Sequence, residues 1–128
     1  MHSCDAKLDS IGNLVEPVRS FANGAIRVAH ISTEEPAAAS EHLLIFVQTR
    51  EGMGSDCFAV SVAPYDNGYY RGYYALDFAK LQASYDEQKG LLLLIPASVN
   101  DQNGNEKRGG DIKVRINRKN DKSVTTEK

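Results

Sequence analysis

The sequence lacks tryptophan, has only two cysteines, and contains no apolar run long enough to cross a lipid bilayer. Apolar stretches such as residues 91–95 fall far short of the roughly 20 residues that a transmembrane helix needs. The cysteines do not form a C-x-x-C pair, which leaves a structural zinc site or a thioredoxin-type redox pair without support. The formal net charge of −2 argues against a dedicated nucleic-acid-binding protein, because such proteins are usually strongly basic.

The two cysteines bear on the compartment. The first residues lack the regions of a secretory signal peptide, which fits a cytoplasmic protein or a mature periplasmic or secreted chain with an added Met1. A disulfide between Cys4 and Cys57 would close a loop of about 53 residues and contribute about 2–4 kcal/mol. Such a bridge requires an oxidising compartment, whereas two unrelated thiols would suit the cytoplasm. We expect a periplasmic or secreted protein, with the cytoplasm as the alternative.

The length and composition predict one domain over residues 1–128. The chain has 128 residues, of which 41% are hydrophobic and 25% are charged, as in ordinary globular domains. A domain of this size buries about two-thirds of its unfolded surface, so it can build a core without metals.

The N-terminal segment 5–22 carries a helical pattern. Its apolar residues recur at spacings of three and four: Leu8, Ile11, Leu14, Val15, Val18 and Phe21. Pro17 opposes this interpretation, because proline lacks a backbone donor and would kink or shorten a helix. The pair Asn23-Gly24 can end a helix, but it is also typical of a hairpin turn. We therefore predict a short helix, with a strand pair around Asn23-Gly24 as the alternative.

From residue 25 to residue 126 the pattern is that of a β domain. Apolar residues alternate with polar ones, and polar turns separate the segments. Two segments are expected to be buried on both faces: 42–50, with its continuous apolar run from Leu43 to Val47, and 91–95, which is apolar throughout. The fold class is mainly β, an antiparallel sandwich or open barrel with the short N-terminal helix. The expected strands cover residues 25–32, 42–50, 57–63, 69–78, 91–95 and 111–117, with a last strand near Val124.

Residues 78–89 fit two conformations. Phe78, Leu81 and Tyr85 would share one face of a second helix, which would make the fold α+β. The polar run that ends at Gly90 is instead typical of a hairpin loop leading into the next strand, and we favour the hairpin. The glycine-containing polar residues 100–110 indicate a loop.

No sequence motif demands catalysis. The H-E-x-x-H, G-x-S-x-G and phosphate-binding glycine patterns are absent, so we assign no catalytic residue, metal or cofactor. His30 and His42, with Glu41, could share an acid–base or metal site if their strands are antiparallel neighbours. A packed or hydrogen-bonded His30 is the more ordinary expectation.

Four tyrosines surround an arginine in residues 69–74. On an extended strand, Tyr69, Arg71 and Tyr73 would face outward, whereas Tyr70 and Tyr74 would face the core. Tyrosine and arginine are enriched at binding hot spots, so the outward face is predicted to bind another protein or a glycan. The alternative is that these rings only stabilise the sheet.

The C-terminal part of the chain is basic. Residues 106–122 hold seven basic and three acidic residues, whereas the preceding 105 residues hold seven basic and thirteen acidic ones. Lys113 and Arg115 share the outward face of the expected strand 111–117 and could bind an acidic or phosphate-bearing partner. Basic residues on a strand also protect a sheet from edge-to-edge pairing, which is the structural alternative.

These features favour a non-enzymatic binding module, an inhibitor or accessory protein of a bacterial envelope that acts through Tyr69, Arg71 and Tyr73. A cytosolic immunity or regulatory protein that binds a charged partner is the first alternative. A small metal-dependent hydrolase built around His30 and His42 is the second. We expect a protein or glycan partner, no nucleic-acid partner and no transmembrane segment.

Overall fold

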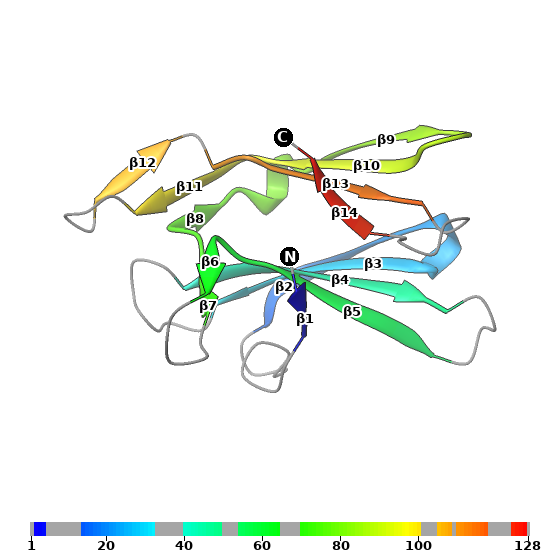
Figure 1. Cartoon of the computed structure of the whole chain (residues 1–128), viewed down its shortest axis with the longest axis horizontal. Coiled ribbons are helices and arrows are strands. Elements are labelled where there is room, and N and C mark those ends of the chain that lie inside the picture. The colour runs from blue at the N-terminus through cyan, green and yellow to red at the C-terminus, as the bar shows by residue number, and fades with distance from the viewer. Residues whose placement is uncertain are drawn as a thin grey trace.

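Antiparallel strands form nearly all of the regular structure of this computed structural model (Figure 1). The structure describes residues 2–4, 14–32, 40–49, 54–64, 70–100, 105–108, 110–117 and 124–127. Each strand pair within these residues is antiparallel. The mainly β fold predicted from the sequence is therefore confirmed.

One layer is a five-stranded sheet with the strand order β1-β5-β4-β3-β2. β3 and β4, and likewise β4 and β5, pair over nearly their whole lengths. The expected strands 25–32, 42–50 and 57–63 are confirmed, with small shifts at their ends. The strands of this sheet are β1 (His2–Ser3), β2 (Leu14–Phe21), β3 (Ile26–Ser32), β4 (Glu41–Gln48) and β5 (Ser55–Val60).

The second layer lies across from the first and contains two sheets, with the orders β14-β13-β10-β9 and β12-β11-β8 (Figure 1). β10 continues into β11 with only Pro96 between them, so the two sheets follow one another along the same layer. The strands are β8 (Ala75–Leu76), β9 (Gln82–Asp86), β10 (Gly90–Ile95), β11 (Ala97–Asn100), β12 (Glu106–Arg108), β13 (Ile112–Ile116) and β14 (Val124–Glu127).

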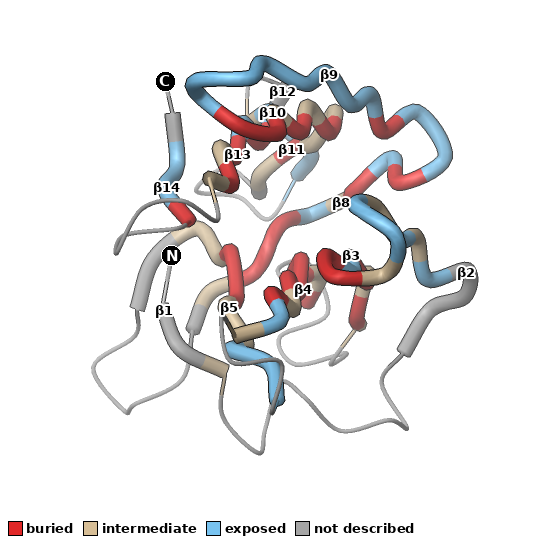
Figure 2. Tube along the Cα trace, turned by 90° about the vertical axis from the view of Figure 1, so that its right-hand side faces the viewer, coloured by how far each residue is buried: buried red, intermediate tan, exposed pale blue. Residues whose placement is uncertain are grey.

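One large cluster of buried side chains draws on both layers, and Figure 2 shows the buried segments of β3, β4, β10 and β13. Removing this apolar surface from water stabilises the contact between the layers. β13 contributes every second residue, as its alternating pattern predicted. The main contributors are Ile26, Val28, Leu43, Ile45, Val47, Val60, Leu91, Leu93, Ile95, Ile112, Val114 and Ile116.

The two apolar strands differ in how they are buried. β4 is buried on both faces, because Leu43 faces the large cluster and Leu44 packs in a second one with Ala29 and Ile31. The prediction for 42–50 is confirmed. In β10, by contrast, Leu92 and Leu94 on the outer face are only half-buried, so the prediction of two buried faces for that strand is wrong.

The prediction of an N-terminal helix is wrong for the part of segment 5–22 that the structure describes. Leu14–Phe21 is strand β2, paired with β3. Pro17 costs a helix a hydrogen bond but is tolerated on an edge strand, which is the position of β2. Asn23 and Gly24 both have positive φ, 56° and 88°, and they reverse the chain into β3. The alternative strand pair is therefore correct, and residues 5–13 of the predicted helix lie outside the described residues.

The expected strand 69–78 is broken into pieces that connect the two layers. β7 (Tyr70–Arg71) pairs with β6 (Ala63–Pro64), and β8 pairs with β11 of the other layer. Between them, Tyr73 forms a bridge to Glu41 of β4. The chain thus changes layers within this segment, so no single strand face persists along it.

A hairpin follows, as favoured from the sequence. A short 3₁₀ turn, η3 (Phe78–Lys80), precedes β9, and β9 pairs with β10 through a tight turn. Asp86 Oδ1 accepts hydrogen bonds from the turn N–H groups of Gln88 and Lys89 at 2.8 and 2.9 Å. Gly90 closes the turn with φ +86°. The second helix of the α+β alternative is wrong.

The polar segment 100–110 also contains part of a hairpin that the sequence analysis missed. β11 and β12 pair from Ser98 opposite Arg108 to Asn100 opposite Glu106. The expected strands near 111–117 and Val124 are present as β13 and β14, which pair with each other.

Candidate functional site

Cys4 and Cys57 form a disulfide that fastens β1 to β5. Their Cα atoms are 5.5 Å apart, and the Cys4 N–H donates to the Cys57 carbonyl oxygen at 3.3 Å. The disulfide that the sequence left open is therefore present, and the alternative of two unrelated thiols is wrong. Both cysteines pack against the second cluster, on the face of the five-stranded sheet that points away from the other layer.

The two histidines lie on adjacent strands but do not share a site. His30 stands opposite Leu43, and His42 stands opposite Ile31, so their side chains are on opposite faces of the β3–β4 pair. The His30 Nε2 atom is 2.7 Å from Glu41 Oε2. The fully buried His42 places Nδ1 2.6 Å from the Ser61 hydroxyl. Among the described residues, no group of three or more His, Cys, Asp or Glu could hold a metal ion.

The outward face predicted for Tyr69, Arg71 and Tyr73 does not form as expected. Tyr73 is buried, and burial raises the pKa of its hydroxyl above the ordinary value of 10.0. Tyr74, expected in the core, is instead 38% exposed. The reason is the change of layer at this point, which inverts the alternation that a continuous strand would keep. Arg71 is half-buried, and Tyr69 lies outside the described residues.

Lys113 and Arg115 lie on the outer face of β13, as predicted. Lys113 is exposed and Arg115 is half-buried, whereas the residues that alternate with them are in the core. Lys113 stands opposite Leu94, and Arg115 stands opposite Leu92. Whether this basic face binds a partner stays a prediction.

The second layer is interrupted along one line, which we call the crease and which passes Asp77, Pro96 and Asp111. The chain crosses this line three times, and each time one strand ends and the next begins: β8 is followed by β9 after η3, β10 by β11 after Pro96, and β12 by β13 just past Asp111. The Asp77 N–H donates to the Pro96 carbonyl oxygen at 2.9 Å, and the Ala97 N–H donates to Asp111 Oδ1 at 3.1 Å. A carboxylate thus replaces part of the ladder at the point where proline interrupts the strand.

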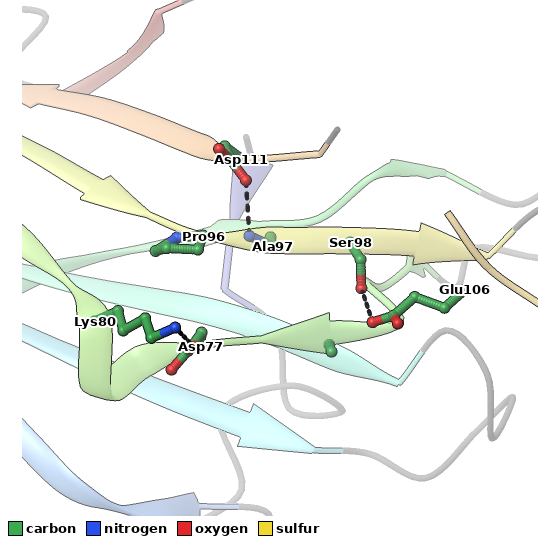
Figure 3. A pocket seen from close by; sticks show the side chains of 8 residues that line it. Asp77, Lys80, Pro96, Ala97, Ser98, Glu106 and Asp111 are labelled. Atoms are coloured by element: carbon green, nitrogen blue, oxygen red, sulfur yellow. Dashed lines mark hydrogen bonds and ion pairs between the residues drawn. The ribbon is translucent and has the colours of Figure 1, made fainter. Parts of the chain in front are cut away.

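A pocket of about 440 Å³ lies at the crease (Figure 3). Asp77 and Asp111 lie at the two sides of Pro96, and Glu106 enters from β12 beside Ser98. The Ser98 hydroxyl donates to Glu106 Oε2 at 2.7 Å, which fixes that carboxylate. The lining residues are Ala75, Asp77, Lys80, Pro96, Ala97, Ser98, Glu106 and Asp111.

The charges in this pocket are unequal. Three carboxylates, Asp77, Glu106 and Asp111, face one ammonium group, that of Lys80. Lys80 Nζ lies 3.6 Å from Asp77 Oδ2, and exposed pairs of this kind contribute little to stability. The remaining carboxylates give the pocket an excess of negative charge, which favours a cationic ligand.

A second hollow of about 560 Å³ continues the crease over β10 and β13. It shares Lys80, Pro96 and Asp111 with the first pocket. Its other walls include the apolar Leu81 and Leu94 and a second ammonium group, that of Lys113. Together the two hollows offer a polar end and a mixed apolar end to a ligand longer than a single side chain.

This site was not predictable from any local pattern in the sequence. Its acidic residues come from a segment read as a strand, Asp77, and from the stretch noted for its basic charge, Glu106 and Asp111. No local spacing relates them, because they meet only at the crease. Among known proteins, no family model, curated sequence or solved structure matches this chain.

Proposed function

We propose that this protein is a non-enzymatic binding module, a β-sandwich that holds a basic segment of another protein at the crease. The observation that carries this proposal is the pocket with three carboxylates, Asp77, Glu106 and Asp111, beside a single lysine. The sandwich assignment is supported by the two layers and the large apolar cluster that draws on both.

The chemistry of the pocket favours a lysine or arginine side chain. A carboxylate has about four acceptor positions, so Glu106 and Asp111 keep acceptors beyond the bonds to Ser98 and Ala97. Hydrogen bonds between a cationic side chain and a carboxylate are about twice as strong as neutral ones. The more apolar hollow past Pro96 would take the residues that flank the cation.

The disulfide supports an oxidising compartment for this activity. A Cys4–Cys57 bridge forms and persists in the periplasm or outside the cell, and such bridges are rare in the cytoplasm. The described residues contain no helix that is long and apolar enough to cross a membrane. We therefore propose a periplasmic or secreted accessory or inhibitory protein of a bacterial envelope. The separation of His30 from His42 gives the hydrolase alternative no support.

The test measures binding of short peptides by fluorescence anisotropy at low and high salt. A lysine- and arginine-rich peptide is compared with a glutamate-rich peptide of the same length. Glu106→Gln and Asp111→Asn should each weaken binding of the basic peptide about tenfold, since a hydrogen bond to a charged group contributes roughly 1.5–3 kcal/mol. Both substitutions keep an oxygen in place for the Ser98 and Ala97 bonds.

The matched control is Glu87→Gln, which removes the same charge from an exposed turn outside the pocket. This variant should bind like the wild type. The proposal is overturned if the basic peptide does not bind, or if Glu87→Gln weakens binding as much as Glu106→Gln. Binding of the acidic peptide that Lys113→Gln abolishes would instead support a charged partner on the β13 face.

A further inference from the structure

β9 is an open sheet edge. It is the terminal strand of the four-stranded sheet, and all five of its residues, Gln82–Asp86, are exposed. In an antiparallel sheet, alternate residues point their N–H and C=O groups to opposite sides of the strand. On its side away from β10, β9 therefore offers a row of backbone donors and acceptors, and no described strand pairs with them.

The other edge strands among the described residues are protected or short. β2 carries Pro17, and its pairing with β3 shifts register between Val15 and Arg19. Proline and bulges are devices by which natural sheets prevent edge-to-edge pairing. β1, β6, β7, β8 and β12 have only two or three residues each, and β14, at the opposite edge of the same sheet, has four residues against five in β9. β9 has neither proline, lysine nor arginine, and its pairing with β10 shows no register shift.

Tyr85 gives this edge an unused apolar surface. It stands opposite Leu91, whose side chain belongs to the core, so Tyr85 lies on the inward side of the sheet. Nevertheless it is 70% exposed, the most exposed of the large hydrophobic residues described. Figure 2 shows β9 as an exposed strand along the border of its layer. Among the described strands, none lies beyond β9 to cover this end of the inner face.

We propose that β9 pairs antiparallel with β9 of a second copy of this chain, about a two-fold axis at Ser84. This register places Ala83 opposite Tyr85 of the second copy, and Gln82 opposite Asp86 of the second copy. The four-stranded sheets then join into one continuous sheet through β9. A two-fold interface of this kind uses the same surface on both copies and closes after two chains.

The sequence of β9 is self-complementary in this register. The small Ala83 leaves room for the ring of the opposing Tyr85, and the two rings cover the inner face that a single copy leaves exposed. The Gln82 amide can donate to the opposing Asp86 carboxylate. No like charges meet, because Asp86 lies opposite the neutral Gln82 and the two-fold axis passes through the uncharged Ser84. The interface is small, so we propose a weak, concentration-dependent dimer.

Two cysteine variants test the register. In Ser84→Cys the two thiols of the dimer face one another across the axis, where directly opposite residues have separations suited to a disulfide. In the control Gln82→Cys the thiols face Asp86 and lie far from each other. Under mild oxidation, Ser84→Cys should form a covalent dimer at least tenfold faster than Gln82→Cys. Equal rates would overturn the proposal.

Sedimentation velocity across a concentration series tests the association itself. The wild type should shift from monomer to dimer, and Ser84→Lys, which sets two like charges at the axis, should remain monomeric. Tyr85→Ala should raise the dissociation constant at least fivefold. Thermal unfolding of each variant at low concentration verifies that the monomer is folded. A wild-type chain that stays monomeric at every concentration overturns the proposal, independently of peptide binding at the crease.

Discussion

Glu41 and Tyr73 exchange two backbone hydrogen bonds and so tie the layer-crossing segment to β4. The Tyr73 N–H donates to the Glu41 carbonyl oxygen at 2.7 Å, and the Glu41 N–H donates to the Tyr73 oxygen at 3.1 Å. The next residue, Tyr74, donates its N–H to Ser98 in the other layer at 2.8 Å. The chain is thus held to both layers within two consecutive residues, which explains why one tyrosine is buried and its neighbour is exposed.

Replacing Tyr73 by alanine should destabilise the fold by about 3 kcal/mol, because it removes a buried aromatic ring and leaves a cavity. Tyr74→Ala, at a ring that is 38% exposed, should cost less than about 1 kcal/mol. Urea unfolding followed by circular dichroism measures both. Equal losses would contradict the assignment of Tyr73 to the core.

Alkaline pH should weaken the fold through Tyr73. Burial raises the pKa of its hydroxyl in the folded protein above the ordinary value of 10.0, so the unfolded chain loses this proton first. The contribution is fully present below pH 10.0 and is lost as the pH rises through the folded pKa. Unfolding free energies measured against pH should therefore fall less steeply in Tyr73→Phe than in the wild type. Parallel curves would show that Tyr73 does not carry this dependence.

Loss of the disulfide should destabilise the protein by about 2–4 kcal/mol, because the unfolded chain regains the freedom of a long loop. The double variant Cys4→Ser/Cys57→Ser and the reduced wild type should give similar unfolding free energies. A thiol titration of the denatured, non-reduced wild type should find no free thiol, since the two cysteines of the sequence pair with each other. Two titrated thiols would also remove the support for an oxidising compartment.

Gly90→Ala should destabilise the β9–β10 hairpin by about 1–3 kcal/mol. Gly90 has φ +86°, and a Cβ there would clash with the Ile116 carbonyl oxygen. Gly54→Ala is the control, because Gly54 also has a positive φ but nothing lies near its missing Cβ. The difference between the two variants in chemical denaturation therefore measures the clash. If Gly54→Ala costs as much, backbone strain alone accounts for the effect.

The parts of the fold that the sequence predicted depend on contacts repeated along one strand. In β13, Lys113 and Arg115 face outward because the core lies on the same side throughout. The apolar run of β4 likewise predicted a strand with two buried faces, and its ends are close to those expected. Such patterns lie within one strand, so the local sequence is enough to predict them.

The features that the sequence did not predict depend on contacts between residues that are far apart in the chain. Alternation alone placed Tyr73 outside, whereas the bonds to Glu41 in β4 place it in the core. The helical spacing over residues 14–21 misled for a related reason, because pairing with β3 outweighs a periodic pattern that contains Pro17. The pocket could not be predicted because Asp77, Glu106 and Asp111 are far apart in the sequence and meet only at the crease, where one strand ends and the next begins.

The proposed binding site and the apolar core are built from different residues. The acidic groups of the site, Asp77, Glu106 and Asp111, lie on short connections and on a short strand, and none belongs to the large apolar cluster. The charge of Asp77 can therefore be changed without touching the core, whereas Glu106 and Asp111 also bond Ser98 and Ala97 and need a replacement that keeps an acceptor oxygen. Under the proposed function, ligand preference would then change through substitutions at a few surface positions while the core residues stay the same.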